Sequence, residues 1–242
     1  ANNALIRYLQ EAILRVGGFS FPWEKRRLAT KIGHETRTED MLREVAFYKA
    51  GVKHANVLTA VVVSEAPACI IMEGGESSLR DAFPRLSPYK QIAFCVAIVG
   101  ALQYLHSLKW AHRDVKPDNI VLVDGVAKLC DYGFAEHIQE NTQYPLRGSP
   151  LYCGPRLYET YVRPSELAML DMWAMLVLFY IVTQGRPPFS RPIHRSNYVA
   201  PNGDVTLIAR LFGQTAPTFT AFARELVADL PYDHATWWWG IL

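Results

Sequence analysis

The spacing of apolar positions along this 242-residue chain changes near residue 75. Before that point the apolar residues form short runs of the length typical of strands, at 26–32, 57–63 and 68–72. Between the first two runs, residues 39–50 repeat apolar side chains at the spacing of a helix. Residues 4–16 fit either a helix or, in part, a first strand. The first 73 residues are therefore predicted to form a small sheet with one main helix.

Helical patterns dominate the rest of the chain. Residues 89–108 and 166–183 are predicted to form long helices, and residues 204–212 and 221–230 are also helical by pattern. Taken with the strand-rich first part, these patterns predict an α+β fold.

The predicted fold has two lobes. The first comprises residues 1–73, a linker spans 74–79, and a larger helical lobe comprises 80–242. The linker is predicted from the Gly- and Ser-rich run EGGESS. Ligands usually bind in clefts between lobes, so the functional residues are expected near this linker.

Composition and charge narrow the function classes. Half of the residues are apolar and a fifth are charged, as in ordinary globular proteins. The net charge of +2 gives no reason to expect a nucleic-acid partner, and Lys25–Arg27 is interpreted as a solvated turn. The two longest apolar runs, 92–102 and 172–182, have 11 residues each, whereas a membrane span needs about 20. No membrane association is expected, and nothing in the sequence indicates an oligomeric state.

The cysteines indicate a cellular compartment. Cys69, Cys95, Cys130 and Cys153 lie 26, 35 and 23 residues apart, and no C-x-x-C motif occurs. This spacing is typical of free thiols in a reducing compartment. The N-terminus also lacks the pattern of a secretion signal. An intracellular location, in the cytoplasm or the nucleus, is therefore expected.

The run HRDVKPDNIVLVDGVAKLCDYGF at 112–134 contains the candidate chemistry. A hairpin is predicted around Asp124-Gly125, with Asn119 at the start of its first strand and Asp131 at the end of its second. An amide oxygen and a carboxylate held side by side suit Mg²⁺. A separate carboxylate, Asp114, could accept a proton from an attacking hydroxyl, and Lys116 could neutralise a transferring phosphoryl group. This set predicts phosphoryl transfer, although an isolated Asp–Asn pair would be interpreted as a turn and a cap.

The motif H-R-D-x-K-P-x-N, with D-Y-G following twelve residues after its asparagine, resembles the eukaryotic-type protein kinases. The resemblance extends upstream. Lys31 in LATKI matches the lysine that holds the α- and β-phosphates of ATP, and Glu44 matches its helical partner. The resemblance implies a bilobal kinase fold with a small antiparallel sheet. The implied catalytic residues are Lys31, Glu44, Asp114, Lys116, Asn119 and Asp131, with Asn119 and Asp131 as ligands of Mg²⁺ and Mn²⁺ as the alternative ion.

The same resemblance implies an adenine site. Met72 in IIMEGGESSL falls at the gatekeeper position, and Glu73 to Gly75 would offer backbone groups to adenine. Ala29 and Val121 would lie on the two sides of the ring. Taken singly, these two residues would be interpreted as ordinary core positions.

Downstream motifs also match the family. In GSPLYCGPR, Ser149 falls where a threonine contacts the catalytic loop, and Asp171 is expected to anchor the backbone of that loop. Lys-Pro after Asp114 goes with serine/threonine specificity, so the implied partner is a protein substrate with a Ser or Thr acceptor. In the family an activation segment follows the catalytic loop, and here it would span about 131–156. Arg113 is expected to pair either with a phosphate on Thr142 or Tyr144 of this segment or with the fixed charge of Glu140.

Several motifs depart from the family pattern. The glycine-rich loop is reduced to VGGFSF, where Gly17 and Gly18 are the remaining candidates for phosphate contact. Arg156 replaces a family glutamate and is predicted to pair with Asp233 or Asp229. Incomplete motifs of this kind are similar to those of virus-encoded kinases. For such a kinase the intracellular location would be a host cell. An active protein kinase is therefore predicted, with a pseudokinase serving as a binding or scaffold module and a small-molecule kinase as the alternatives.

Overall fold

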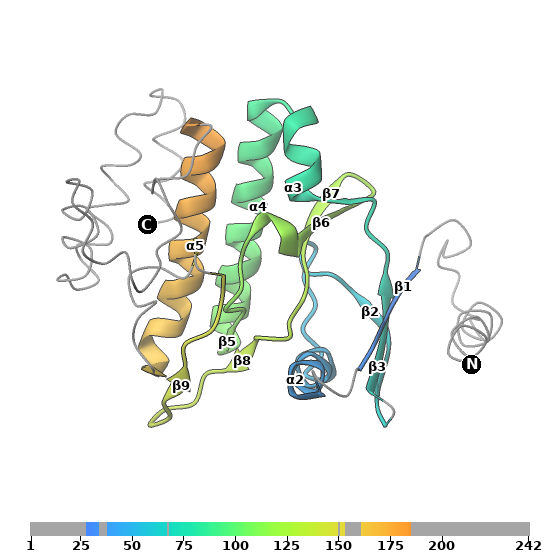
Figure 1. Ribbon diagram of the computed structural model, residues 1–242, viewed down its shortest axis with the longest axis vertical. Helices are drawn as coiled ribbons and strands as arrows, with labels where there is room; N and C mark the ends of the chain where they lie inside the picture. Colours follow the sequence, from blue (N-terminus) through green and yellow to red (C-terminus); the bar gives the residue numbers. More distant parts are fainter. Residues whose placement is uncertain (1–27, 34–37, 67, 150, 153–160, 185–242) are drawn as a thin grey trace.

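The computed structural model describes residues 28–33, 38–66, 68–149, 151–152 and 161–184 (Figure 1). The predicted elements at 4–16, 204–212 and 221–230 lie outside the described residues. The same is true of Gly17 and Gly18, and of Arg156 with its predicted partners.

A three-stranded antiparallel sheet forms the first part of the described chain. It contains β1 (Leu28–Ile32), β2 (Ala60–Glu65) and β3 (Ala68–Glu73), in the order β1-β3-β2. Lys31 lies opposite Ile70 in the β1–β3 register. Helix α2 (Thr38–Lys49) packs on this sheet, because its apolar positions Met41 and Val45 join a buried cluster with Ile70. The predicted antiparallel sheet with one main helix is confirmed.

Two long helices dominate the second part, α4 (Pro88–Ser107) and α5 (Pro164–Gln184), which lie side by side (Figure 1). The start of α4 follows from its sequence. The Ser87 side chain accepts a hydrogen bond from the Lys90 backbone N–H, and Pro88 occupies the first turn, where its missing N–H costs nothing. Both helices agree with the predicted ranges to within two residues.

The hairpin between α4 and α5 consists of β6 (Ile120–Val123) and β7 (Val126–Leu129), as the sequence predicts. Asp124 and Gly125 both adopt positive φ, 50° and 75°, which suits the two-residue turn of such hairpins. Strand β4 (Ser77–Ser78) pairs with β6, so the end of the predicted linker belongs to this sheet.

The remaining described elements are short. They are α3 (Leu79–Ala82), η3 (Phe83–Arg85), β5 (Trp110–Ala111), η4 (Pro117–Asn119), β8 (Glu136–His137), β9 (Tyr144–Pro145) and β10 (Tyr161–Val162). Strand β5 pairs with β8, and β9 pairs with β10.

The predicted strand at 57–63 begins later in the structure, at Ala60. Val57 instead forms an isolated parallel bridge with Leu129 of β7. The Leu58 N–H donates to the Leu129 carbonyl at 2.9 Å, and the Leu129 N–H donates to the Asn56 carbonyl at 2.8 Å. These two bonds satisfy the backbone groups of Leu129 in the hairpin. Val57 and Leu58 are themselves buried, so this segment joins the two lobes.

The main core lies between α4, α5 and the hairpin, and it includes Ile98, Leu102, Leu129 and Trp173. Phe47 of α2 belongs to the same core, so the helix of the small lobe is anchored in the large one. The described elements have the bilobal architecture that the sequence predicts. No helix among the described residues is long and apolar enough to cross a membrane.

Candidate functional site

The hairpin brings Asn119 and Asp131 next to each other, but neither lies in a strand. Asn119 is the last residue of η4, and Asp131 lies two residues after the end of β7, which corrects the sequence prediction. The Cys130 N–H donates to the Asn119 carbonyl at 2.9 Å, and this bond closes the base of the hairpin. Asp131 adopts a φ of 62°, a conformation that L-residues other than Asn and Asp rarely adopt.

Asp114 lies at the centre of a hydrogen-bond network. Its Oδ2 accepts from Lys116 Nζ at 2.7 Å and from Asn119 Nδ2 at 2.9 Å, and its Oδ1 accepts from Ser149 Oγ at 2.8 Å. Lys116 Nζ also donates to Ser149 Oγ at 2.8 Å. The predicted contact of Ser149 with this loop is confirmed, and the network fixes the Asp114 carboxylate from three sides.

The loop around Asp114 is anchored from the core. Asp171, which is 1% exposed on α5, accepts the backbone N–H groups of His112 at 2.8 Å and Arg113 at 2.7 Å, as predicted. His112 contributes a second tie. Its Nε2 lies 2.9 Å from the Cys130 carbonyl, while the Asp114 N–H donates to its Nδ1. Since a carbonyl only accepts and an N–H only donates, the ring is the neutral tautomer with the proton on Nε2.

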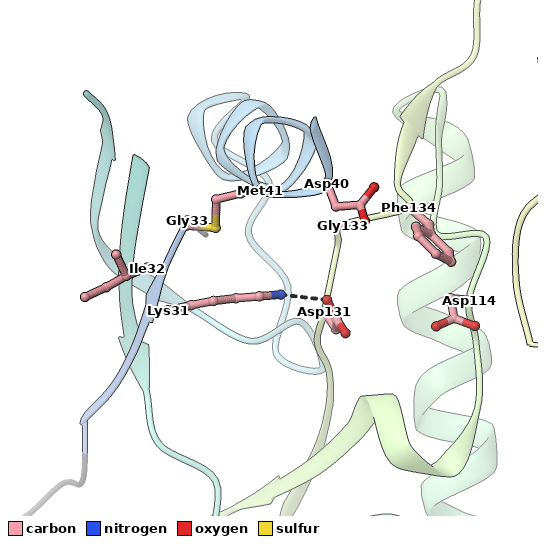
Figure 2. Close-up of a pocket in the computed structure, with 9 residues that line it drawn as sticks. All are labelled: Lys31, Ile32, Gly33, Asp40, Met41, Asp114, Asp131, Gly133 and Phe134. Atoms are coloured by element: carbon pink, nitrogen blue, oxygen red, sulfur yellow. Dashed lines mark hydrogen bonds and ion pairs between the residues drawn. The ribbon is translucent and has the colours of Figure 1, made fainter. Parts of the chain in front are cut away.

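Lys31 connects the sheet to α2 and to the hairpin. Its ammonium donates to Glu44. It also donates to Asp131 Oδ1 at 2.7 Å (Figure 2). Burial by itself would lower the pKa of Lys31, but the Glu44 and Asp131 carboxylates outweigh this effect and raise it. Burial would raise the pKa of Asp131, but Lys31 holds it below its usual value. Both groups are therefore ionised at neutral pH, and the predicted Lys31–Glu44 pair is confirmed.

A cavity of about 150 Å³ lies beside this ion pair. It is lined by Lys31, Ile32, Gly33, Asp40, Met41, Asp114, Asp131, Gly133 and Phe134 (Figure 2). In this view Lys31 reaches across the cavity toward Asp131, and Asp114 lies beyond Asp131 on the side of the large lobe. One cavity is thus lined by the cationic side chain of Lys31 and by the carboxylates of Asp114 and Asp131.

The predicted linker, residues 74–79, directly follows β3 and is called the hinge below. Met72 and Glu73 are buried, and Ala29 lies opposite Met72 in the register, two residues from Lys31 and so on the same face of β1. A Cβ on Gly75 would lie 2.8 Å from the Val121 Cβ, closer than side chains approach. Gly75 therefore allows the hinge backbone to pass directly over Val121.

Tyr132, in the D-Y-G motif, is fully buried. Its ring stacks on Phe47 of α2 with centroids 3.7 Å apart, and its hydroxyl donates to the Leu129 carbonyl at 2.9 Å. The buried hydroxyl of Tyr132 therefore has a backbone partner, and the ring joins α2 to the hairpin.

Comparison with known proteins agrees with this geometry. The family model described as "Protein kinase domain" matches residues 24–233. The chain belongs to the protein kinase family. Proteins of this family in general use ATP and a divalent metal ion.

Three of the relatives of this kinase domain are serine/threonine-protein kinases by name. It is 31% identical over 193 residues to serine/threonine-protein kinase TIO of Arabidopsis thaliana, which covers 76% of this chain and 14% of the relative. It is 32% identical over 168 residues to serine/threonine-protein kinase 36 of Pongo abelii, covering 66% and 12%. It is 33% identical over 173 residues to serine/threonine-protein kinase ULK3 of Homo sapiens, covering 67% and 36%. The chain therefore spans only a minor part of each of these relatives.

The kinase hinge has a buried ion pair that the sequence did not predict. The Glu73 carboxylate, 2% exposed, accepts from Lys128 Nζ of β7 at 2.7 Å and from the Thr59 N–H at 2.7 Å. The pair ties Glu73, the last residue of β3, to the hairpin. Lys128 alternates with buried residues in β7, and its own side chain is largely buried at 14% exposure.

Lys128→Met is expected to destabilise the kinase domain by about 3 kcal/mol, because it removes a cationic partner of the buried Glu73 carboxylate. That loss corresponds to a decrease of roughly 6–12 °C in melting temperature. The double variant Lys128→Met/Glu73→Gln should recover much of the loss, since it leaves no buried charge. Thermal unfolding monitored by circular dichroism measures both, and a single variant as stable as the parent would contradict the role of this pair.

Tyr132→Phe keeps the aromatic ring and removes the hydroxyl. Because the Leu129 carbonyl loses a buried donor, the variant is expected to be less stable by about 1 kcal/mol. The stacking on Phe47 is kept, so phosphoryl transfer should stay within about twofold of the parent, well under one tenfold step in rate. Urea unfolding and steady-state rates test the two expectations, and a gain in stability would show that the hydroxyl is not accommodated.

Arg113 pairs with a different residue from the one predicted. Its guanidinium contacts Glu136, with Nη1 3.3 Å from Oε2, and the predicted partner Glu140 is exposed. Tyr144 is also corrected as a phosphate acceptor, since it is 4% exposed and its hydroxyl donates to the His137 carbonyl. No sequence pattern pointed to Glu136, because pairing of the two-residue strands β5 and β8 brings it beside the catalytic loop.

Proposed function

We propose that this kinase domain transfers the γ-phosphate of ATP to serine or threonine hydroxyls of protein substrates. The observation that carries the proposal is the Asp114 carboxylate, held by Lys116, Asn119 and Ser149 at the cavity where Lys31 meets Asp131. A fixed carboxylate next to a phosphate-binding cavity is what hydroxyl-directed phosphoryl transfer requires.

In this proposal Asp114 orients the substrate hydroxyl and accepts its proton. Its side chain is 11% exposed, so the carboxylate can be approached from the cavity but is largely shielded from water. Lys116, 22% exposed, holds one oxygen of Asp114 and adds a positive charge where the phosphoryl group would arrive. Lys31, oriented by Glu44, supplies the second positive charge, for the α- and β-phosphates.

Asn119 and Asp131 are proposed to hold the divalent ion. The Asn119 Nδ2 is occupied by the Asp114 carboxylate and carbonyl, so the amide oxygen is the end of the side chain left for a cation. The Asp131 carboxylate is half-exposed beside it. The described residues contain no cluster of three or more His, Cys, Asp or Glu that could hold a metal ion. Two hard oxygen donors favour Mg²⁺, with Mn²⁺ as the alternative, and when bound the ion would neutralise phosphate charge.

The adenine site and the lobe boundaries belong to the same proposal. Adenine would lie between Ala29 and Val121, against the backbone of Glu73 to Gly75, with Met72 behind it. Its support is the close packing of Gly75 on Val121 and the position of Ala29 opposite Met72. Residues 1–73 would form the small lobe, 74–79 the hinge and 80–242 the large lobe, with Gly17 and Gly18 in the phosphate loop.

Serine/threonine specificity is supported by the Lys-Pro that follows Asp114 and by the relatives, each of which is named a serine/threonine-protein kinase. A protein substrate, no nucleic-acid partner and an intracellular location are proposed with it. Cys69, Cys95 and Cys130 are unpaired thiols, which fits a reducing compartment.

Transfer of labelled γ-phosphate from ATP tests the proposal. The chain is incubated with a generic protein substrate such as casein, with Mg²⁺, with Mn²⁺ and with EDTA, and the label is identified by phosphoamino-acid analysis. Phosphoserine or phosphothreonine that depends on the metal supports the proposal. Binding of ATP without transfer would favour the pseudokinase alternative, and phosphotyrosine alone would contradict the assigned specificity.

A further inference from the structure

Six charged side chains form a cluster beside the cavity, and the proposed chemistry uses none of them directly. They are Glu39, Asp40 and Arg43 of α2, Arg113 of the catalytic loop, and Glu136 and Arg147 of the activation segment. These six residues are called the α2 charge cluster below. It joins three segments that are far apart in the sequence, and its three guanidinium groups balance its three carboxylates.

Arg113 is the buried member of the cluster. Its side chain is 2% exposed, and burial lowers the pKa of its guanidinium, an effect that Glu136 opposes. Nη1 donates to Glu136, Nη2 donates to the Pro145 carbonyl, and the Tyr144 ring lies 5.9 Å from Cζ. A carboxylate, a carbonyl and an aromatic face therefore surround this cation, as a buried guanidinium requires.

Glu136 also faces α2. Its Oε2 lies 3.8 Å from Arg43 Nε, the same oxygen that contacts Arg113. Arg43 in turn donates to Asp40 at 2.8 Å and to Glu39 at 3.0 Å within the helix. Glu136 thus lies between the catalytic loop and the helix, and its single negative charge holds two cations together.

Arg147 makes a second connection between the activation segment and α2. Its Nη1 lies 3.1 Å from Asp40 Oδ1, and its guanidinium packs over the Phe134 ring at 5.6 Å. The first turn of α2 is therefore held by Glu136 through Arg43 and by Arg147 through Asp40. One turn further along, the same helix presents Glu44 to Lys31, so a shift of this turn would move Glu44 relative to Lys31.

We infer that Glu136 is a positioning residue whose fixed carboxylate joins Arg113 to Arg43, so that the chain assembles the Lys31–Glu44 pair without a phosphate on its activation segment. The inference rests on the proposed function and concerns its regulation. The cluster already has balanced charge, and Arg113 has almost no exposed surface on which a phosphate could bind. A phosphate on Thr142 would have to displace Glu136, the Pro145 carbonyl or the Tyr144 ring from Arg113.

The test compares phosphate-free parent protein with Glu136→Gln, Glu136→Asp and the control Glu140→Gln. The control removes an exposed glutamate of the same segment. Proteins are treated with λ phosphatase, checked by intact mass, and assayed for transfer in a short initial-rate window. The treated parent and the control should keep their rates to within about twofold, whereas Glu136→Gln should lose about 10- to 100-fold in kcat, the effect of one or two tenfold steps in barrier. Glu136→Asp, which keeps the charge, should restore part of that loss, whereas a purely steric role would give no such rescue.

A double-mutant cycle with Arg43→Gln tests whether Glu136 acts through α2. If it does, the losses in kcat for Glu136→Gln and Arg43→Gln should not add in the double variant. Loss of parent activity on phosphatase treatment, or a Glu136→Gln variant as active as the parent, would overturn the inference. If the parent transfers no phosphate at all, the proposed function fails, and the same cycle measured by urea unfolding decides the inference. Additive unfolding shifts would then show that Glu136 does not join these elements.

Discussion

Asp131→Asn is expected to reduce phosphoryl transfer by about 10³-fold or more. The change removes a ligand of the proposed metal ion and the partner of Lys31 at 2.7 Å. The metal ion and Lys31 are the two cations that would stabilise phosphate charge. A loss of about 4 kcal/mol of transition-state stabilisation gives a factor of this size. Initial rates of transfer at saturating ATP, over a range of Mg²⁺ concentrations, measure it.

The fold should survive this substitution. The Asp131 side chain is half-exposed, and asparagine accepts the backbone φ of 62° better than other residues do. Asp131→Ala is expected to show the same loss of transfer with a small additional loss of stability, about 1 kcal/mol, from the strained backbone. Full activity in either variant, with unchanged dependence on metal, would show that Asp131 does not have the proposed role.

Asp114→Asn is expected to lower kcat by about 10²- to 10⁴-fold, the usual contribution of a positioned general base. The amide keeps the size of the side chain but cannot accept the substrate proton. Nucleotide affinity should change little, because Asp114 bonds to Lys116, Asn119 and Ser149 and makes no hydrogen bond with Lys31. Steady-state kinetics and binding of a fluorescent ATP analogue measure the two quantities separately.

Ser149→Ala is the matched control for Asp114. It removes one hydrogen bond to the Asp114 carboxylate and leaves the carboxylate in place, so a loss of no more than about tenfold is expected. An Asp114→Asn variant with the rate of the parent would contradict the assignment of the base. Equal losses in both variants would indicate that orientation of the loop, rather than proton transfer, limits the rate.

Local patterns in the sequence were enough to predict the regular elements and the central motif. The ranges of α2, α4 and α5 follow from apolar spacing, because each helix buries one or more faces in a core. The hairpin follows from Asp124-Gly125, which prefers the turn that both residues adopt. The motif residues Lys31, Glu44, Asp114, Asn119 and Asp131 were identified from spacing and resemblance, and the structure brings them to one cavity or its immediate surroundings.

Interactions between distant segments had no sequence pattern and were therefore missed or wrongly assigned. Two short strands placed Glu136, rather than Glu140, beside Arg113, and strands of two residues have no periodicity to recognise. Lys128 alternates with buried residues in β7, yet its ammonium reaches the buried Glu73 carboxylate at the end of β3, in the other sheet. Val57 was predicted to belong to a strand of the small-lobe sheet, but it pairs instead with Leu129 at the edge of the hairpin.

The sequence by itself therefore determined the kinds of element and the identity of the chemical groups, since turn preference, helix period and side-chain type are local properties. Only the tertiary structure decided which charges meet. Ion pairs such as Arg113–Glu136, Arg147–Asp40 and Lys128–Glu73 join residues 23 to 107 positions apart. Their partners are selected by burial and by the packing of segments that are distant in the sequence, and both exist only after the two lobes have come together.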